Sequence, residues 1–285
     1  MSLALLLALS LVLSLAPAPA FAHEYWLTVS DQTPLLGQRV DIGAAAGTGF
    51  RGEAKLWEPQ RAVEFAWHNF RGFSLAPMAP AGEPRWGSIT FPDTTGVWVQ
   101  YQSNFALITL APAAFEDYLA EEGLGGPLAV RRKTGDRRDG RERYRRCAKA
   151  WLDGTSLRRA KTVLGQPLEL IPLARPGADS VLRVRVQWQG KPLVGALVHT
   201  YRQPLGSDGR VRPLDERDSV GVSQARRSDA HGEVALSVAE SGEWLASVVH
   251  MVASADTVAA DWESTWASLT FVRRALPATV AKPAW

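Results

Sequence analysis

The sequence predicts a mostly β-protein with two antiparallel β-sandwich domains joined by a helical linker segment. Short aromatic and β-branched runs, punctuated by Gly and Pro, recur in both halves of the chain, as is typical of sandwiches. Between these halves the pattern changes to helical periodicity around a basic segment. We therefore expect domains at 23–112 and 164–274, a helical and basic-loop linker at 113–163, and a tail at 275–285.

Residues 1–22 have the pattern of a secretory signal peptide. Met1 to Leu15 is an apolar run without charged side chains, and Pro17 and Pro19 follow it before a small-x-small site ending at Ala22. The run is short for a membrane span, which needs about 20 apolar residues. We expect cleavage after Ala22 and export, and an uncleaved membrane anchor is the alternative.

Short strands account for the first half of the mature chain. The clearest one places Val97, Val99 and Tyr101 on one face and Trp98 on the other. The expected strands are Tyr25–Val29, Gln38–Ile42, Ala54–Trp57, Gly87–Phe91 and Gly96–Gln102.

The middle of the chain is predicted to be helical. Ala113–Glu122 places Phe115, Tyr118 and Leu119 on one side of a helix. We expect a second helix at Arg141–Leu152 and a flexible loop between the two helices.

Strands return in the second half. Leu182–Trp188 alternates apolar with polar residues, as a half-buried strand does. Pro172, within an earlier strand, predicts an edge position or an early end of the strand, because proline cannot donate a hydrogen bond to a neighbouring strand. The expected strands are Leu168–Leu173, Ala196–Arg202, Glu233–Val238, Trp244–Met251 and Thr265–Val272, together with Leu182–Trp188.

The cysteine content and the distribution of charge limit what the protein can do. A single cysteine, Cys147, rules out an intramolecular disulfide and is expected to be a small buried residue. The segment from Arg131 to Arg146 has nine basic and three acidic residues, a net charge of +6. Export and the scarcity of interleaved aromatic residues argue against nucleic acid, so we interpret the segment as a solvated loop, with an anionic membrane surface as the alternative.

Six segments resemble the DUF4198 family in the family's order along the mature chain. They are His23–Leu27, Phe115–Leu124, Glu142–Ala150, Gly165–Leu173, Trp244–Met251 and Asp261–Phe271. The first resembles the family's "HEFWL" opening, although Tyr25 stands where the family has Phe. Gly190–Val198 and the turn Asp229–Gly232 also resemble transthyretin-like or carboxypeptidase-regulatory-like sandwiches.

This resemblance implies a periplasmic protein associated with nickel and cobalt uptake. It implies a divalent transition metal, nickel or cobalt, as the ligand and a membrane metal-uptake component as partner; copper is a further option because of the donors of His23 described below. The oligomeric state is left open. Fold resemblance alone does not fix function.

The candidate metal ligands begin with His23, because a terminal histidine offers both its amine and its imidazole to one ion, which suits nickel or copper. His250 is a second candidate if the two domains pack together, and Asp256, Asp261 and Glu263 follow as possible oxygen ligands.

The sequence leaves other functions open. Enzyme motifs such as a nucleophile elbow, a phosphate loop or H-E-x-x-H are absent from the sequence, so we do not expect an enzyme. An interaction or carbohydrate-binding module is the main alternative, and a groove of exposed tryptophans would favour it. A copper oxidative enzyme with a histidine brace at His23 is a third possibility.

Overall fold

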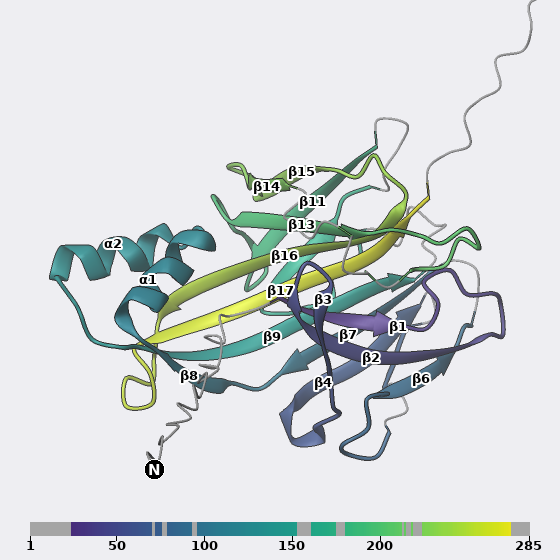
Figure 1. The fold of residues 1–285 in the computed structure, drawn as a ribbon, viewed down its shortest axis with the longest axis horizontal. Helices are drawn as coiled ribbons and strands as arrows, with labels where there is room; N and C mark the ends of the chain where they lie inside the picture. Colours follow the sequence, from purple (N-terminus) through teal and green to yellow (C-terminus); the bar gives the residue numbers. More distant parts are fainter. Residues whose placement is uncertain are drawn as a thin grey trace, which may run out of the picture.

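A computed structural model describes residues 24–69, 72–75, 79–92, 96–152, 161–174, 180–212, 214, 218 and 224–274, with the backbone alone at 72–75. His23 lies outside these residues. The described chain is mostly β, as predicted, and its strands form one large sheet and two small ones (Figure 1).

The large sheet has nine strands in the described part of the chain. In spatial order they are β14 (Gln224–Arg227), β13 (Leu197–Gln203), β16 (Gly242–Ala253), β17 (Trp262–Arg273), β9 (Gly140–Leu152), β7 (Val97–Ser103), β4 (Ala62–Asn69) and β5 (Gly72–Leu75), with β8 (Ala106–Leu110) also paired to β9. The β9–β17 pair is parallel, and the other pairs of this sheet are antiparallel.

The two small sheets each contain four described strands. The N-terminal sheet comprises β1 (Glu24–Val29), β2 (Arg39–Thr48), β3 (Arg51–Lys55) and β6 (Gly87–Thr90). The C-terminal sheet comprises β10 (Leu168–Pro172), β11 (Val181–Trp188), β12 (Lys191–Pro192) and β15 (Glu233–Ser237). Within the described strands β10 pairs with β11 alone, so the edge position predicted from Pro172 is confirmed.

The small sheets cover opposite faces of the large sheet. Successive side chains of a strand point to opposite faces, so β9 contributes Cys147 to the core under the C-terminal sheet and Ala148, Ala150 and Leu152 to the core under the N-terminal sheet. Each small sheet therefore forms a sandwich with a different face of one shared sheet.

Three short helical segments complete the described fold. They are η1 (Pro59–Arg61), α1 (Pro112–Glu121) and α2 (Gly125–Thr134). The helix predicted at Ala113–Glu122 is confirmed as α1, whose Phe115, Tyr118 and Leu119 pack into a third core with Trp266. None of the helices in the described chain has the length and apolar character needed to span a membrane.

The helix predicted at Arg141–Leu152 is wrong, because this segment is the central strand β9. Its residues alternate between the two faces of the sheet, and its pairing with β7, β8 and β17 outweighs the helical preference of its Arg, Glu, Ala and Lys residues. β9 lies within the predicted linker and pairs with strands from both halves of the chain. The linker segment therefore joins the two halves through the large sheet. The predicted domain boundaries stay predictions.

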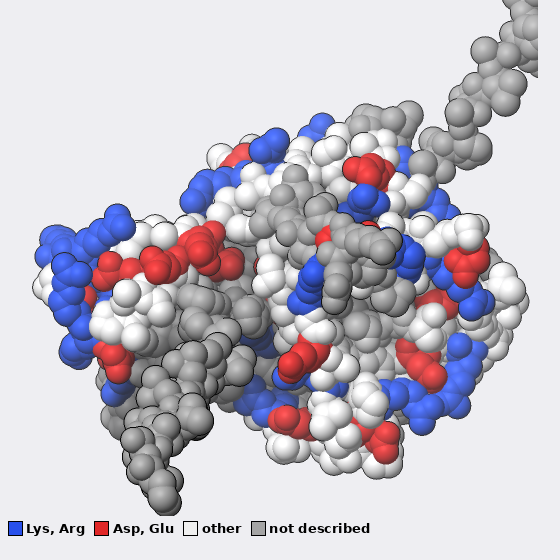
Figure 2. All heavy atoms as spheres, in the orientation of Figure 1, with Lys and Arg blue, Asp and Glu red and all other residues white. Residues whose placement is uncertain are grey.

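The flexible loop predicted at Gly123–Gly140 is also wrong over most of its length, because it contains α2. Leu128 packs α2 onto the α1 core, and Gly135 ends the helix in the left-handed conformation that glycine adopts readily. Figure 2 shows basic side chains gathered over this projecting end of the molecule. Arg132, Lys133, Arg137 and Arg138 are exposed there. The prediction of a solvated loop from Arg131 to Arg146 is otherwise wrong, because Arg131 is buried and the basic residues from Arg141 onward belong to β9, where they are only partly exposed.

Candidate functional site

The three predicted carboxylate ligands lie against arginines of β9. Glu263 accepts a hydrogen bond of 3.0 Å from Arg143 Nε. Asp261 Oδ2 lies 3.4 Å from Arg141 Nε, and Asp256 Oδ2 lies 3.9 Å from Arg143 Nη1. These pairs balance the charge of the carboxylates without a metal ion. Within the described chain, no three His, Cys, Asp or Glu side chains are grouped so as to hold a metal.

His250 lies on the face of the large sheet that the C-terminal sheet covers. Its ring is 4.9 Å from the ring of Trp188 on β11, and burial lowers its pKa. β1 packs on the other face, where Thr270 donates a hydrogen bond to the Leu27 carbonyl. Glu24, the residue after His23, is therefore on the face opposite His250. The expectation that His250 lies beside His23 stays a prediction, because His23 lies outside the described residues.

A different set of polar side chains surrounds the start of β1. We call it the Glu122 cluster, and it comprises Glu24, Glu122, Glu142, Arg146, His199 and Tyr201. The Tyr201 hydroxyl donates a short hydrogen bond to Glu24. His199 Nε2 lies 4.0 Å from Glu122 Oε2. Strands β1, β9 and β13 and the end of α1 thus bring together groups that are far apart in the sequence.

The carboxyl groups of this cluster are strongly perturbed. Burial and, next, the nearby Glu24 carboxyl raise the pKa of Glu122 to about 8. Burial raises the pKa of Glu142 to about 7 and also raises that of Glu24. The Arg146 guanidinium acts in the opposite direction on all three. Carboxyl groups with raised pKa values are partly or largely protonated near neutral pH, and a cation bound among them would favour their ionised form.

His199 has the protonation state of a ligand. Burial lowers its pKa, which favours the neutral imidazole. Its Nε2 atom is buried and has no hydrogen-bond partner among the described residues. Ser268 Oγ and Glu142 Oε2, on the same face of the sheet, are likewise buried without a partner there. A buried polar atom usually has a protein group or an ordered water as its partner, so these three atoms can each take a further hydrogen bond or contact.

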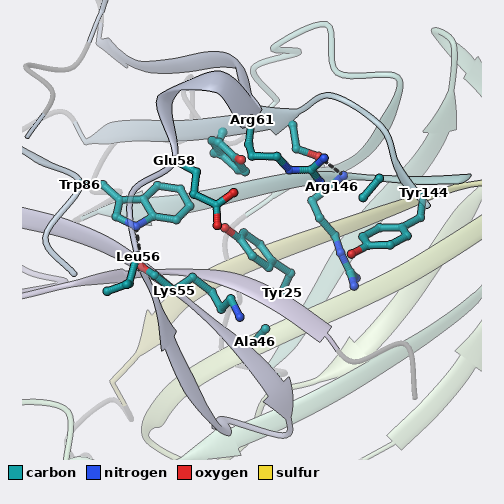
Figure 3. Close-up of a pocket in the computed structure, with 12 residues that line it drawn as sticks. Tyr25, Ala46, Lys55, Leu56, Glu58, Arg61, Trp86, Tyr144 and Arg146 are labelled. Carbon is teal, nitrogen blue, oxygen red and sulfur yellow. Dashed lines mark hydrogen bonds between the residues drawn. The ribbon is translucent and has the colours of Figure 1, made fainter. Parts of the chain in front are cut away.

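Arg146 belongs to the Glu122 cluster and also lines a cleft. Its guanidinium carbon lies 4.8 Å from the centre of the Trp266 ring, 5.0 Å from Tyr144 and 5.8 Å from Tyr25. The Tyr25 cleft, as we call it, has a volume of about 350 Å³ and lies between the N-terminal and large sheets (Figure 3). Its lining residues are Tyr25, Ala46, Lys55, Leu56, Glu58, Arg61, Trp86, Tyr101, Ser103, Ala106, Tyr144 and Arg146.

Residue-by-residue reasoning missed most of this cluster, although the sequence held a signal for it. Four of the segments that resemble the family contribute residues that lie in the Glu122 cluster or contact it. They contribute Glu24, Glu122, Glu142 with Arg146, and Ser264 with Trp266. His199 shares a strand face with Leu197 and Tyr201, a pattern that on its own indicates packing. Its link to Glu122 depends on the contact between α1 and β13, which no sequence pattern reveals.

The fold and the cluster define a mostly β-protein in which two small sheets flank a shared large sheet and a polar cluster lies where the first strand begins. The chain belongs to the family described as "Domain of unknown function (DUF4198)", whose sequence profile matches residues 20–252. The family resemblance is thereby confirmed. No curated protein matches the chain.

Proposed function

We propose that this protein is exported to the periplasm, binds a divalent transition metal of the nickel or cobalt class, and passes it to a membrane uptake component. The observation that carries the proposal is the position of His199 and Glu122 around Glu24. The residue next to Glu24 is His23, which signal-peptide cleavage after Ala22 would make the first residue of the mature protein. The metal is the cargo of the protein.

The donor atoms suit such an ion. The metal ligands we assign are His23, His199 and Glu122, with Glu24 as a further oxygen donor. Two donors each about 2.1 Å from one ion are about 3.0–3.4 Å apart. His199 Nε2 and Glu122 Oε2 are 4.0 Å apart, a difference that a small side-chain rotation closes.

His23 supplies what the described residues lack. Consecutive Cα atoms are about 3.8 Å apart, so its amine and imidazole are tethered close to Glu24. With His199 they would offer three nitrogen donors beside one or two carboxylates, a mixture that suits nickel, cobalt and copper. This explains why the described residues alone do not form a metal site.

The alternative of a carbohydrate-binding groove built from tryptophans receives less support. None of the tryptophans in the described chain is exposed, and most of them lie in the cores.

The test is metal binding by the mature protein with its own N-terminus. Mass spectrometry first establishes whether the chain begins at His23, and titration calorimetry with Ni²⁺ and Co²⁺ then gives the stoichiometry and affinity. We expect one ion per chain and a loss of affinity of at least tenfold in His23→Ala and in His199→Ala.

Two controls make the result specific. His231→Ala removes an exposed turn histidine and should leave the affinity unchanged. An extra residue placed before His23 blocks the amine and should weaken binding as His23→Ala does. Binding that is unaffected by His23→Ala and His199→Ala, or no binding at all, contradicts the proposal.

A further inference from the structure

The Tyr25 cleft adjoins the Glu122 cluster, and Arg146 belongs to both. Strands β1, β2 and β3 and the η1 turn form one wall, and β7, β8 and β9 form the other (Figure 3). At about 350 Å³ the cleft is at the small end of the range for sites that bind small molecules, which are about 300–1,000 Å³. A ligand with one ring and a few substituents fits this size.

Cationic side chains outnumber anionic ones around the cleft. Lys55, Arg61 and Arg146 contribute three positive charges, and Glu58 contributes one negative charge. The Lys55 ammonium has no hydrogen-bond or ion-pair partner within the described chain. Arg61 donates one hydrogen bond of 2.9 Å to the Phe105 carbonyl, which leaves several of its N–H groups for another acceptor.

Aromatic rings form the floor and side of the cleft. The Tyr25 and Tyr101 rings stack with centres 5.9 Å apart, and Trp86 packs edge-on against Tyr101 at 4.8 Å. Tyr101 and Trp86 are buried, whereas Tyr25 and Tyr144 are partly exposed. Tyr101 stacks on Tyr25 and the Arg146 guanidinium lies over Tyr25 and Tyr144, so the remaining exposed part of each ring is what a ligand contacts. Flat rings beside cationic groups recognise a ligand that has a planar or ring-shaped body and an anionic end.

From these observations we infer that the Tyr25 cleft binds a small organic anion, a single ring that carries a carboxylate. The carboxylate pairs with Lys55 or Arg61, which lie on either side of Glu58 in Figure 3, and the ring lies against the exposed parts of Tyr25 and Tyr144. The Glu58 carboxylate, which projects into the cleft in Figure 3, accepts a hydrogen bond from a hydroxyl on the ring. This site does not depend on the proposed metal function.

Two kinds of ligand have a single ring that carries a carboxylate, namely an aromatic acid and a sugar acid. The experiment distinguishes between them. The mature protein is titrated with 4-hydroxybenzoate and with D-glucuronate, with binding followed by calorimetry and by ligand-observed NMR. The uncharged counterparts 4-hydroxybenzyl alcohol and methyl glucoside serve as matched ligands. We expect one of the acids to bind at least tenfold more tightly than its uncharged counterpart.

Variants of the lining residues test whether the acid binds in the Tyr25 cleft. Lys55→Gln and Arg61→Gln should each weaken binding of the acid about tenfold, whereas Lys191→Gln, an exposed lysine of the C-terminal sheet, should not. Nickel affinity should be unchanged in Lys55→Gln, so failure of one proposal is distinguishable from failure of the other. The inference is overturned if neither acid binds, if the uncharged ligand binds as tightly, or if Lys55→Gln and Arg61→Gln bind as the wild type does.

Discussion

At the scale of single residues, several charged side chains lie in the interior with one defined partner. Lys149 and Glu169 are each 1% exposed and form an ion pair of 2.9 Å. Glu169 also accepts hydrogen bonds from the backbone N–H groups of Leu164 and Gly165. Cys147, beside them on the same face of β9, is buried as expected from the sequence, and burial raises its pKa to about 12.

Removing one partner of the buried pair should be costly. Lys149→Met leaves the Glu169 carboxylate buried without a counter-charge, and we expect a loss of about 3–5 kcal/mol in the free energy of unfolding. Urea denaturation measures this value. Arg185→Met breaks the ion pair with Glu233, whose partners are 37% and 33% exposed, and should cost at most about 1 kcal/mol. Equal losses in the two variants would contradict the account of the buried pair.

Glu243 should make stability depend on pH. It is buried, accepts short hydrogen bonds from Gln32 and Gln203, and burial raises its pKa from 4.5 to about 7. Because the folded-state pKa is the higher one, its contribution is fully present below pH 4.5 and is lost as the pH rises through 7. The shift corresponds to about 3 kcal/mol at most.

The variant Glu243→Gln removes this titration. Its stability relative to the wild type should therefore increase between pH 4 and pH 8, measured by urea denaturation at a series of pH values. Glu53→Gln, in the exposed strand β3, should follow the wild type. A constant difference between Glu243→Gln and wild type across this range would show that Glu243 is not a buried acid.

At the scale of elements, local patterns identified many strands and one helix but failed around β9. β1, β7, β11 and α1 lie close to their predicted ranges because each has a clear apolar face. β9 is buried on both faces for part of its length and includes Glu142 and Lys149 in the interior, so its polar residues resembled a helix surface. The contacts that make it a strand come from β7 and β17, which are distant in sequence.

The junction of β9 with α1 should be sensitive to one added methyl group. A Cβ atom at Gly140 would lie 2.2 Å from the Phe115 ring, so Gly140→Ala should lose about 1–3 kcal/mol by overpacking. Gly126 in α2 has open space around its would-be Cβ, and Gly126→Ala should be neutral or stabilising by up to about 1 kcal/mol. Thermal unfolding compares the two, and a neutral Gly140→Ala would contradict the packing of α1 against β9.

At the scale of the whole molecule, the large sheet draws strands from both halves of the chain. The sequence predicted sandwiches correctly, but it could not indicate that both would use the same sheet, because that depends on the parallel pairing of β9 with β17. The same pairing brings β13, α1 and β1 together and so creates the Glu122 cluster. The Glu122 cluster could therefore not be predicted from the sequence without first predicting the strand pairing of the large sheet.

A shared sheet predicts shared folding. We expect the mature protein to unfold in a single calorimetric transition, with equal calorimetric and van't Hoff enthalpies. A fragment of residues 164–274 lacks β9, the neighbour of β17, and should not fold alone. Two separate transitions together with a stably folded fragment would show that the halves are independent domains.

The most direct test of the account is a crystal structure of the mature protein, beginning at His23, with Ni²⁺ bound. The account predicts nickel between His23, His199 and Glu122, on the face of the large sheet that β1 covers. Nickel bound at His250 or among Asp256, Asp261 and Glu263 on the other side, or no bound nickel at saturating concentration, would contradict it.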